Sequence, residues 1–319
     1  MIVDIPDTTT SKVAKQLNQL REAGGVVALT RVLTLVILTS EENAEPAIEA
    51  ANLASREHPC RIIVLATGDA GRRTHLDAQI RVGGDAGASE VIVLRGSGEL
   101  AEHSEAMVSA LLLPDAPIVA WWADDIPPKV SETSIGRLAH RRITDTAKDP
   151  RPLQALRTLA ASYTDGDSDL AWTRLTGWRV QLASILDTLD PASITEVTVE
   201  TAPELPSAAL LASWLQRSLR VPVTLRRDEV GRFQALSAVR LHTPDGDVVL
   251  SRPHGDIADL HLPDVPVQRV PLPLRTLEDC LAEELRRLDA DEVFGEVLTR
   301  GLADTDLADC LEQSPRVAG

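Results

Sequence analysis

The chain has 319 residues, and its 32 Lys and Arg against 48 Asp and Glu give a formal net charge of −16 at pH 7. With 44% hydrophobic and 25% charged residues, its composition is that of a soluble globular protein long enough for two domains. The acidic balance argues against nucleic acid or an anionic membrane as partner, because long-range repulsion would oppose either.

The first half of the chain alternates apolar, strand-like runs with amphipathic, helix-like segments. Residues rich in branched aliphatic side chains predict strands at 31–38, 61–66, 77–82, 90–94, 117–122 and 141–144. Apolar residues at helical spacing predict helices at 8–23, 44–56, 99–112 and 151–162. This alternation predicts a Rossmann-like mixed α/β domain over residues 1–165, ended by a polar, turn-forming linker at 163–168.

The most regular pattern lies just beyond that linker, from Asp169 to Asp190. Its apolar residues recur at three- and four-residue steps, which predicts one uninterrupted helix with Arg174 and Arg179 on opposite flanks of an apolar stripe. Two interpretations stay open for Trp172 and Trp178 on that stripe. They pack the core, or they form a partner-binding surface with the two arginines, because Trp and Arg are enriched at interface hot spots.

The remainder of the chain predicts a different architecture. Strands are expected at 194–200, 223–227, 232–241, 247–252, 257–261 and 267–270, and helices at 207–220, after Thr276 and around 293–298. The turn sequence Pro244-Asp245-Gly246 joins two of the strands into a hairpin. We therefore expect an α+β domain with antiparallel hairpins over 166–302, followed by a loose acidic tail at 303–319.

Gly96-Ser97-Gly98 is the nearest approach to a phosphate-binding loop, because it follows a predicted strand and precedes a predicted helix. The third glycine of the dinucleotide fingerprint is missing, and no Lys-Ser or Lys-Thr follows. Glu99 also stands where the phosphate charge would go. A plain strand-to-helix turn is therefore favoured, and a sugar-phosphate or nucleotide-binding enzyme remains the alternative.

Asp124 and Asp125 follow a predicted strand end, a place where α/β proteins often bind ligands, but Pro127-Pro128 directly after them indicates a rigid exposed turn. The preceding Trp121 and Trp122 must point to opposite sides of their strand. At least one of these indole rings is therefore expected at a face that a helix covers or a partner touches.

No other group of residues predicts chemistry. The possible metal ligands His254, Asp256, Asp259 and His261 match no zinc or calcium spacing, so a solvated sheet face is expected. Nucleophile motifs are absent, and the cysteines, which lack C-x-x-C spacing, are expected to be reduced structural thiols: Cys60, Cys280 and Cys310. With neither a signal-peptide pattern nor a membrane-spanning run, we expect a cytoplasmic protein without metal or cofactor.

Three motifs in this order resemble the glucose-6-phosphate dehydrogenase assembly protein family (OpcA) of actinobacteria and cyanobacteria: PDAPIVAWW at 114–122, DLAWTRLTGWR at 169–179 and CLAEELRRLD at 280–289. The resemblance extends from about residue 31 to residue 298. It implies a non-catalytic protein that binds glucose-6-phosphate dehydrogenase and favours its active oligomer, which increases NADPH supply from the oxidative pentose phosphate pathway. The residues expected at the contact are Trp121, Trp122, Trp172, Arg174, Trp178 and Arg179. A scaffold that binds other pathway enzymes without changing any rate is a further alternative.

Overall fold

The computed structural model describes residues 1–23, 32–68, 70–82, 90–101, 104–228 and 235–304. The chain divides into two compact units, and neither unit is one continuous stretch of sequence. The first comprises Met1–Asp145, Thr164–Leu170 and Thr276–Ala290, and the second comprises Thr146–Tyr163, Ala171–Arg275 and Asp291–Gly319. The domain boundary expected at residue 165 stays a prediction.

The described part of the first unit contains an eight-stranded sheet in the order β1-β4-β5-β3-β2-β6-β7-β8. Its strands are β1 (Ile2–Ile5), β2 (Leu33–Ser40), β3 (Cys60–Thr67), β4 (His75–Arg81), β5 (Glu90–Ser97), β6 (Ile118–Trp122), β7 (Arg141–Thr144) and β8 (Asp167–Asp169). Every pair from β5 to β8 in this order is parallel, while β4 and β1 add an antiparallel edge. Numbered along the chain, the six parallel strands lie in the spatial order 3-2-1-4-5-6, which is the doubly wound order of dinucleotide-binding folds. The predicted Rossmann-like mixed α/β fold is confirmed.

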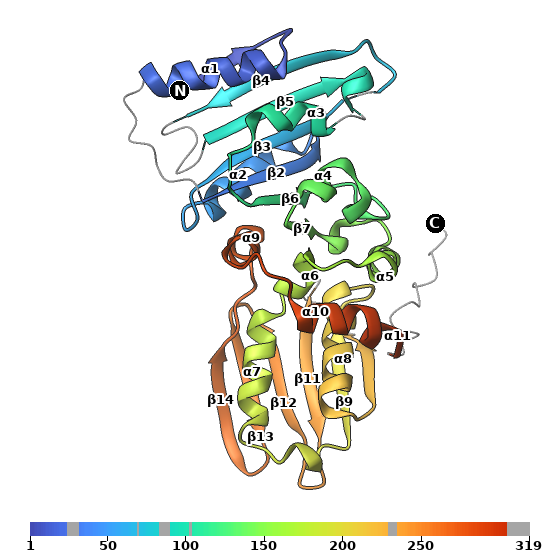
Figure 1. The fold of residues 1–319 in the computed structure, drawn as a ribbon. Coiled ribbons are helices and arrows are strands. Elements are labelled where there is room, and N and C mark those ends of the chain that lie inside the picture. The colour runs from blue at the N-terminus through green and yellow to red at the C-terminus, as the bar shows by residue number, and fades with distance from the viewer. Residues whose placement is uncertain (24–31, 69, 83–89, 102–103, 229–234, 305–319) are drawn as a thin grey trace, which may run out of the picture. The chain divides into compact units, whose positions relative to one another are not determined.

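Helices cover both faces of this sheet (Figure 1). They are α1 (Thr10–Ala23), α2 (Ala44–Ala54), α3 (Ser104–Val108), α4 (Ser134–Leu138) and α9 (Leu277–Arg286). One core cluster joins α2 and α9 to the same face of the sheet, with Ile48, Ala51, Cys280 and Leu281 buried against strand residues such as Ile62. Helix α9 begins after Thr276, as predicted, and its start carries a capping box between Thr276 and Asp279. The helix expected at 99–112 was wrong in extent, because α3 covers only five residues of it.

The second unit is built on a six-stranded sheet, within the described residues, in the order β10-β9-β11-β12-β13-β14. Its strands are β9 (Glu196–Thr201), β10 (Val223–Arg227), β11 (Leu236–His242), β12 (Val248–His254), β13 (Ile257–Leu262) and β14 (Val265–Pro271). Only the pair β9–β10 is parallel, and β9, β11, β12, β13 and β14 follow each other as antiparallel neighbours. This confirms the predicted α+β fold with antiparallel hairpins.

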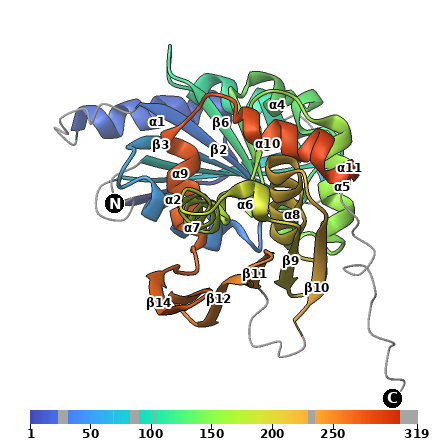
Figure 2. The same ribbon diagram turned by 90° about the horizontal axis from the view of Figure 1, so that it is seen from below.

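The helices α7 (Thr176–Leu186) and α8 (Pro206–Leu219) lie on one face of this sheet (Figures 1 and 2). The unit also contains α5 (Pro152–Ser162), most of α6 (Leu170–Thr173), α10 (Glu292–Glu296), a π-helical turn at Val297–Gly301 and α11 (Leu302–Asp304). Alternate strand residues face the helices, and on β12 these are Val248, Leu250 and Arg252, all buried. An arginine thus stands at a position of the strand that usually holds a core side chain. The expected acidic tail lies mostly outside the described residues.

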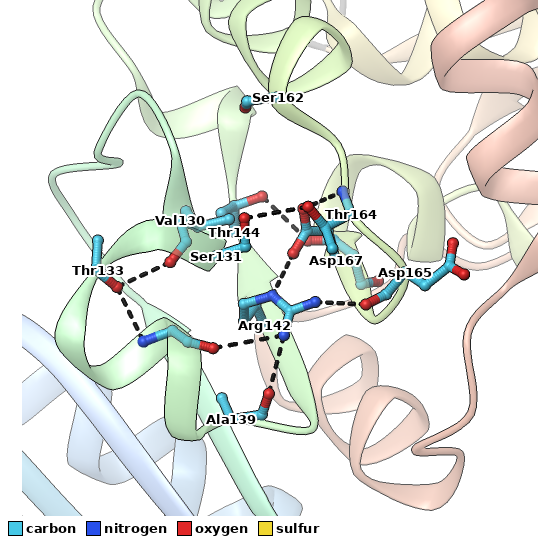
Figure 3. A network of polar contacts seen from close by, with 12 residues as sticks. Val130, Ser131, Thr133, Ala139, Arg142, Thr144, Ser162, Thr164, Asp165 and Asp167 are labelled. Carbon is cyan, nitrogen blue, oxygen red and sulfur yellow. Dashed lines mark hydrogen bonds and ion pairs between the residues drawn. The ribbon is translucent and has the colours of Figure 1, made fainter.

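Part of the polar segment expected to be a linker is instead the edge strand β8. Asp167, Ser168 and Asp169 are each at most 1% exposed, and they pair with β7 from Arg142 to Thr144. The Arg142 guanidinium donates hydrogen bonds to the Asp167 carboxylate and to the carbonyl oxygens of Ala139 and Asp165 (Figure 3). Asp167 also accepts a bond from the amide nitrogen of Thr164, at 2.8 Å. The polar residues are buried because they satisfy one another, and a hydrophobicity pattern carries no sign of this.

Replacing Asp167 by Asn should destabilise the first unit by about 3–5 kcal/mol, because the Arg142 charge would stay buried without a counter-charge. The matched control is Glu57→Gln, which removes an ion pair with Arg286 whose side chains are 57% and 58% exposed. Such a surface pair contributes less than about 1 kcal/mol. Urea unfolding followed by circular dichroism measures both, and equal shifts of the midpoint would contradict the prediction.

Candidate functional site

A pocket of about 700 Å³ opens at the carboxyl ends of the central parallel strands. Its walls come from the ends of β2, β3 and β6 and from residues before and within α4, including Thr39, Ser40, Thr67, Trp122 and Asp124. β2 pairs with β3 on one side and with β6 on the other. This is the point where the strand order reverses, and it is where doubly wound folds bind ligands. The position alone makes this pocket the first candidate site of the first unit.

The Asp124 carboxylate lies at the inner wall of this switch-point pocket and is held by the end of β2. Its Oδ2 accepts hydrogen bonds from the Thr39 hydroxyl at 2.8 Å, the Ser40 amide at 2.7 Å and the Ser40 hydroxyl at 2.9 Å. Burial acts to raise the pKa of the Asp124 carboxyl, but these bonds, with a further one from Asn43, lower it below the ordinary value. The side chain is therefore a fixed negative charge.

This arrangement does not favour phosphate binding, because the donors at the end of β2 already bond to Asp124. In dinucleotide-binding folds, the first strand leads through glycines to amides at a helix start, and these amides receive the phosphate. Here the corresponding segment from Thr39 to Asn43 contains no glycine, and α2 follows it. The Ser40 amide is bonded to the protein's own carboxylate. The negative charges of Asp124, Asp125, Glu41 and Glu42 would also repel a phosphate.

The Gly96-Ser97-Gly98 turn also shows no phosphate-binding geometry. Gly96 and Ser97 are the last residues of β5, and a short 3-10 turn, Gly98–Ala101, follows. Gly98 has a φ of +63°, and a Cβ atom there would lie 2.5 Å from the Thr74 amide nitrogen. The Glu99 amide donates to the Thr74 hydroxyl at 3.4 Å. Close approach of Thr74 therefore accounts for Gly98 without a ligand.

Trp121 and Trp122 have different surroundings, as their alternation on β6 predicts. Trp121 is fully buried in the core cluster shared with α2 and α9, and within the described structure its indole Nε1 has no hydrogen-bond partner. Trp122 is 3% exposed and lines the switch-point pocket. A role for either ring in binding a partner stays a proposal.

The single helix expected from Asp169 to Asp190 was wrong, because the structure has two. Helix α6 ends at Thr173 and α7 begins at Thr176. Between them the Leu175 amide bonds back to the Trp172 carbonyl, and the Thr173 carbonyl accepts a bond at 2.9 Å from Arg275, 102 residues later. A bond from such a distant residue interrupts the helix, so the local apolar pattern could not reveal it.

Trp172 anchors α6 to α10 within the second unit. Its indole Nε1 donates to the Asp291 carboxylate at 2.9 Å, and the other carboxylate oxygen of Asp291 accepts the Phe294 amide at the start of α10. The Trp172 and Phe294 rings are 5.9 Å apart, and the Arg179 guanidinium lies 3.9 Å from the centre of the Trp172 ring. This contact combines aromatic packing with a cation–π interaction.

Trp178 is 3% exposed and lines a second pocket together with Arg174, while Arg179 is half-buried. The tryptophans of the predicted stripe therefore pack inside the second unit. The solvent face of α7 instead presents Val180, which is 60% exposed. Sequence reasoning missed Val180 because it lies outside the Trp and Arg motif. In the sequence, the sign that Val180 could be exposed was its place outside the predicted apolar stripe of this segment.

The remaining candidates from the sequence, the possible metal ligands and the cysteines, form no metal-binding or catalytic cluster within the described residues. Within the described residues, no three His, Cys, Asp or Glu side chains are arranged to hold a metal ion. Cys60 and Cys280 are buried thiols of the first core cluster, whereas Cys310 lies outside the described residues. None of the helices described here combines the length and the hydrophobicity needed to cross a bilayer.

Residues 51–161 match the family model of the glucose-6-phosphate dehydrogenase subunit N-terminal domain, and residues 165–298 match that of the C-terminal domain. The chain belongs to this family, OpcA. The two OpcA models together cover most of the sequence, in the expected order. No curated protein sequence matches the chain.

Several solved structures are distantly similar to this OpcA-family chain. A glucose-6-phosphate 1-dehydrogenase from Mycobacterium avium has 13% identity and a TM-score of 0.47, over 89% of this chain and 93% of that one. An oxidoreductase from Sinorhizobium meliloti has 9% identity and a TM-score of 0.47, over 85% and 95%. A 3-ketoreductase from Actinomadura kijaniata in complex with NADP has 8% identity and a TM-score of 0.43, over 85% and 94%. Values this low do not bear on function.

Replacing Asp124 by Asn should cost about 1–2 kcal/mol at pH 7, because the charged acceptor of three hydrogen bonds is lost. Since folding lowers the pKa of Asp124, its contribution is full above the unfolded pKa of about 4 and is lost as the pH falls through the folded pKa. The stability difference between the OpcA-family wild type and the variant should therefore shrink below about pH 4. Urea unfolding at several pH values measures it. Asp125→Asn, at the exposed neighbouring position, is the control, and an equal loss there would contradict the assignment.

Replacing Gly98 by Ala should destabilise the protein far more than replacing Gly255 by Ala. Both glycines have positive φ, at +63° and +51°, so both variants bear the cost of left-handed backbone, about 1 kcal/mol. Only at Gly98 would the new methyl group meet backbone atoms, whereas nothing lies within 4 Å at Gly255. Thermal unfolding compares the two. Equal stability, with altered nucleotide binding at Gly98 alone, would instead favour the phosphate-loop hypothesis.

Proposed function

We propose that this protein is a non-catalytic assembly factor that binds glucose-6-phosphate dehydrogenase and favours its active oligomer. The observation that carries the proposal is the match to both OpcA models over residues 51–161 and 165–298. The proposed setting is the cytoplasm, where the pairing would increase flux into the oxidative pentose phosphate pathway and the supply of NADPH.

The geometry of the first unit supports a non-catalytic role. The switch-point pocket stands where a doubly wound enzyme would hold a dinucleotide, yet Asp124 engages the amide and hydroxyl groups at the end of β2. The alternative, a sugar-phosphate or nucleotide-binding enzyme, would use the Gly96-Ser97-Gly98 turn. There the Glu99 amide bonds to Thr74, which makes this alternative the weaker one.

The proposed activation is a shift of population. If the dehydrogenase exchanges between a weakly active and an active assembly, a protein that binds the active assembly more tightly raises its fraction. A tenfold activation needs a difference in binding free energy of about 1.4 kcal/mol, which one or two hot-spot contacts can supply. Linkage requires that any substrate or cofactor favouring the same assembly also tightens binding of this protein.

Helix α7 is the proposed contact surface. Trp172 and Trp178 are buried, so their proposed role is to fix α6 and α7 in place, while Arg174 and Arg179 border the surface. Val180 supplies an exposed apolar side chain at the helix centre, beside the exposed small residues Ala183 and Ser184. An apolar centre bordered by arginines is typical of protein interfaces. Trp121 and Trp122 would act only by supporting β6.

Titrating this protein into glucose-6-phosphate dehydrogenase of the same organism, with light scattering on the same mixtures, tests the proposal. We expect a saturable rise in kcat or fall in KM together with a co-eluting complex. The scaffold alternative predicts binding of other pathway enzymes without any change in rate. No binding and no rate change at about tens of micromolar, a range where specific complexes form, would contradict the proposed function.

Val180→Glu should weaken activation about tenfold or more, because a charge would be buried at the contact, and should leave the fold intact. Its matched control is Val265→Glu on β14, where the native side chain is 45% exposed. Arg174→Ala with Arg179→Ala should also weaken activation, but Arg179 packs on Trp172, which makes Val180→Glu the sharper test. Undiminished activation by a folded Val180→Glu variant would remove α7 from the interface.

A further inference from the structure

Four arginines among the described residues are almost fully buried, and one of them differs from the others. Arg61 pairs with Glu90, Arg141 with Glu284 and Arg142 with Asp167, in each case with a carboxylate that is also buried. Arg252 of β12 is 7% exposed and makes no ion pair with any carboxylate of the described residues. Among the described residues, the other three buried guanidinium groups therefore each have a buried carboxylate as counter-charge, and Arg252 has none.

The surroundings of Arg252 give it dipoles instead of a counter-charge. Its Nη1 donates to the Leu272 carbonyl at 3.5 Å and its Nη2 to the Leu236 carbonyl at 3.1 Å. The guanidinium carbon lies 5.5 Å from the centre of the Trp178 ring. Burial lowers the pKa of Arg252, and the charge of Asp256, too distant for an ion pair, acts in the opposite direction. The positive charge is therefore incompletely compensated in a low-dielectric place.

This arginine lines a pocket of about 230 Å³ in the second unit. Two more arginines, Arg174 and Arg275, line the same pocket, and the described lining contains no Asp or Glu. The remaining walls are apolar or weakly polar: Leu175, Trp178, Leu205, Ser207, Ala235, Leu236 and Leu274. Three guanidinium groups thus meet at one small cavity in a chain whose net charge is −16.

Distant parts of the sequence hold this arrangement in place. Arg275 follows the last strand of the sheet and donates to the Thr173 carbonyl between α6 and α7, at 2.9 Å. Ser207 is buried near the start of α8, and its hydroxyl is bonded to the Ala171 carbonyl at 2.8 Å. The cavity wall is therefore pre-organised, which reduces the cost of ordering side chains when a ligand binds.

We propose that this arginine pocket binds a small ligand that carries a phosphate or carboxylate group. Arg252 supplies the buried positive charge at its base, and Arg174 and Arg275 approach the anion from the rim. Guanidinium groups bind both oxyanions through paired N–H donors, and such charge-assisted bonds are stronger than neutral ones. The volume is below the roughly 300–1,000 Å³ typical of drug-sized ligand sites, so the bound group is small and a dinucleotide would not fit. The proposal does not depend on the proposed function, although Arg174 and Trp178 belong both to this pocket and to the proposed contact region.

Isothermal titration calorimetry on the full chain, without any dehydrogenase, tests the proposal. The probes are inorganic phosphate and malonate, each against sodium chloride at equal ionic strength. Saturable binding of either probe supports the pocket, and the comparison distinguishes a phosphate from a carboxylate site. An identical response to sodium chloride, or no saturable binding of either probe at about tens of millimolar, a range that detects even weak sites, would overturn it.

Two variants locate the binding. Arg252→Met keeps an apolar side chain at the buried position and should weaken binding about tenfold or more, since a charge-assisted bond is lost. Arg174→Gln changes the half-buried rim, should also weaken binding, and serves if the first variant is unfolded. Arg269→Met is the control, because that side chain is 82% exposed on β14. Unchanged binding in folded Arg252→Met or Arg174→Gln protein would overturn the proposal.

Discussion

Arg141 and Arg142 are neighbours on the short strand β7, and strand alternation sends their side chains to opposite faces of the sheet. Arg141 bonds to the Glu284 carboxylate of α9 at 2.7 Å and to the Asp289 carbonyl at 2.8 Å. Arg142 bonds to Asp167 of β8. Removing one partner of a buried pair costs about 3–5 kcal/mol, because a charge is left without compensation. These two pairs therefore bind separate stretches of sequence into the first unit.

The two pockets differ in how their charged and polar groups are compensated. In the switch-point pocket the protein's own Asp124 accepts hydrogen bonds from the Ser40 amide and from the Thr39 and Ser40 hydroxyls, which are donors that a bound phosphate could otherwise use. In the arginine pocket of the second unit, the buried Arg252 charge is met by two carbonyl oxygens and the Trp178 ring but by no paired carboxylate of the described residues. The first pocket thus repels anions, and the second is suited to attract one.

The central parallel strands were predictable from their apolar runs. The hairpins and the capped helix α9 were predictable as well, because turn and cap residues lie next to the elements that they begin or end. The strand β8 was not predictable, since its side chains are polar and their burial depends on Arg142 and Thr144 in β7. The division between α6 and α7 depends in the same way on Arg275. Of the candidate site residues, the sequence singled out Arg174 and Trp178. Alternation in β12 places Arg252 on the same face as Val248 and Leu250, but the sequence did not show that this face stays buried as far as Arg252 or that no carboxylate pairs with it.

The discontinuity of the two units has a consequence for how this protein can be divided. The chain passes from one unit to the other after residues 145, 163, 170, 275 and 290. A polypeptide that ended before Thr276 would lack α9, and with it the buried Cys280 and Leu281 and the counter-charge of Arg141. Neither unit can therefore be produced, exchanged between proteins or lost in evolution as a single segment of gene. A truncation after residue 275 would therefore remove part of both units, because each has a later segment.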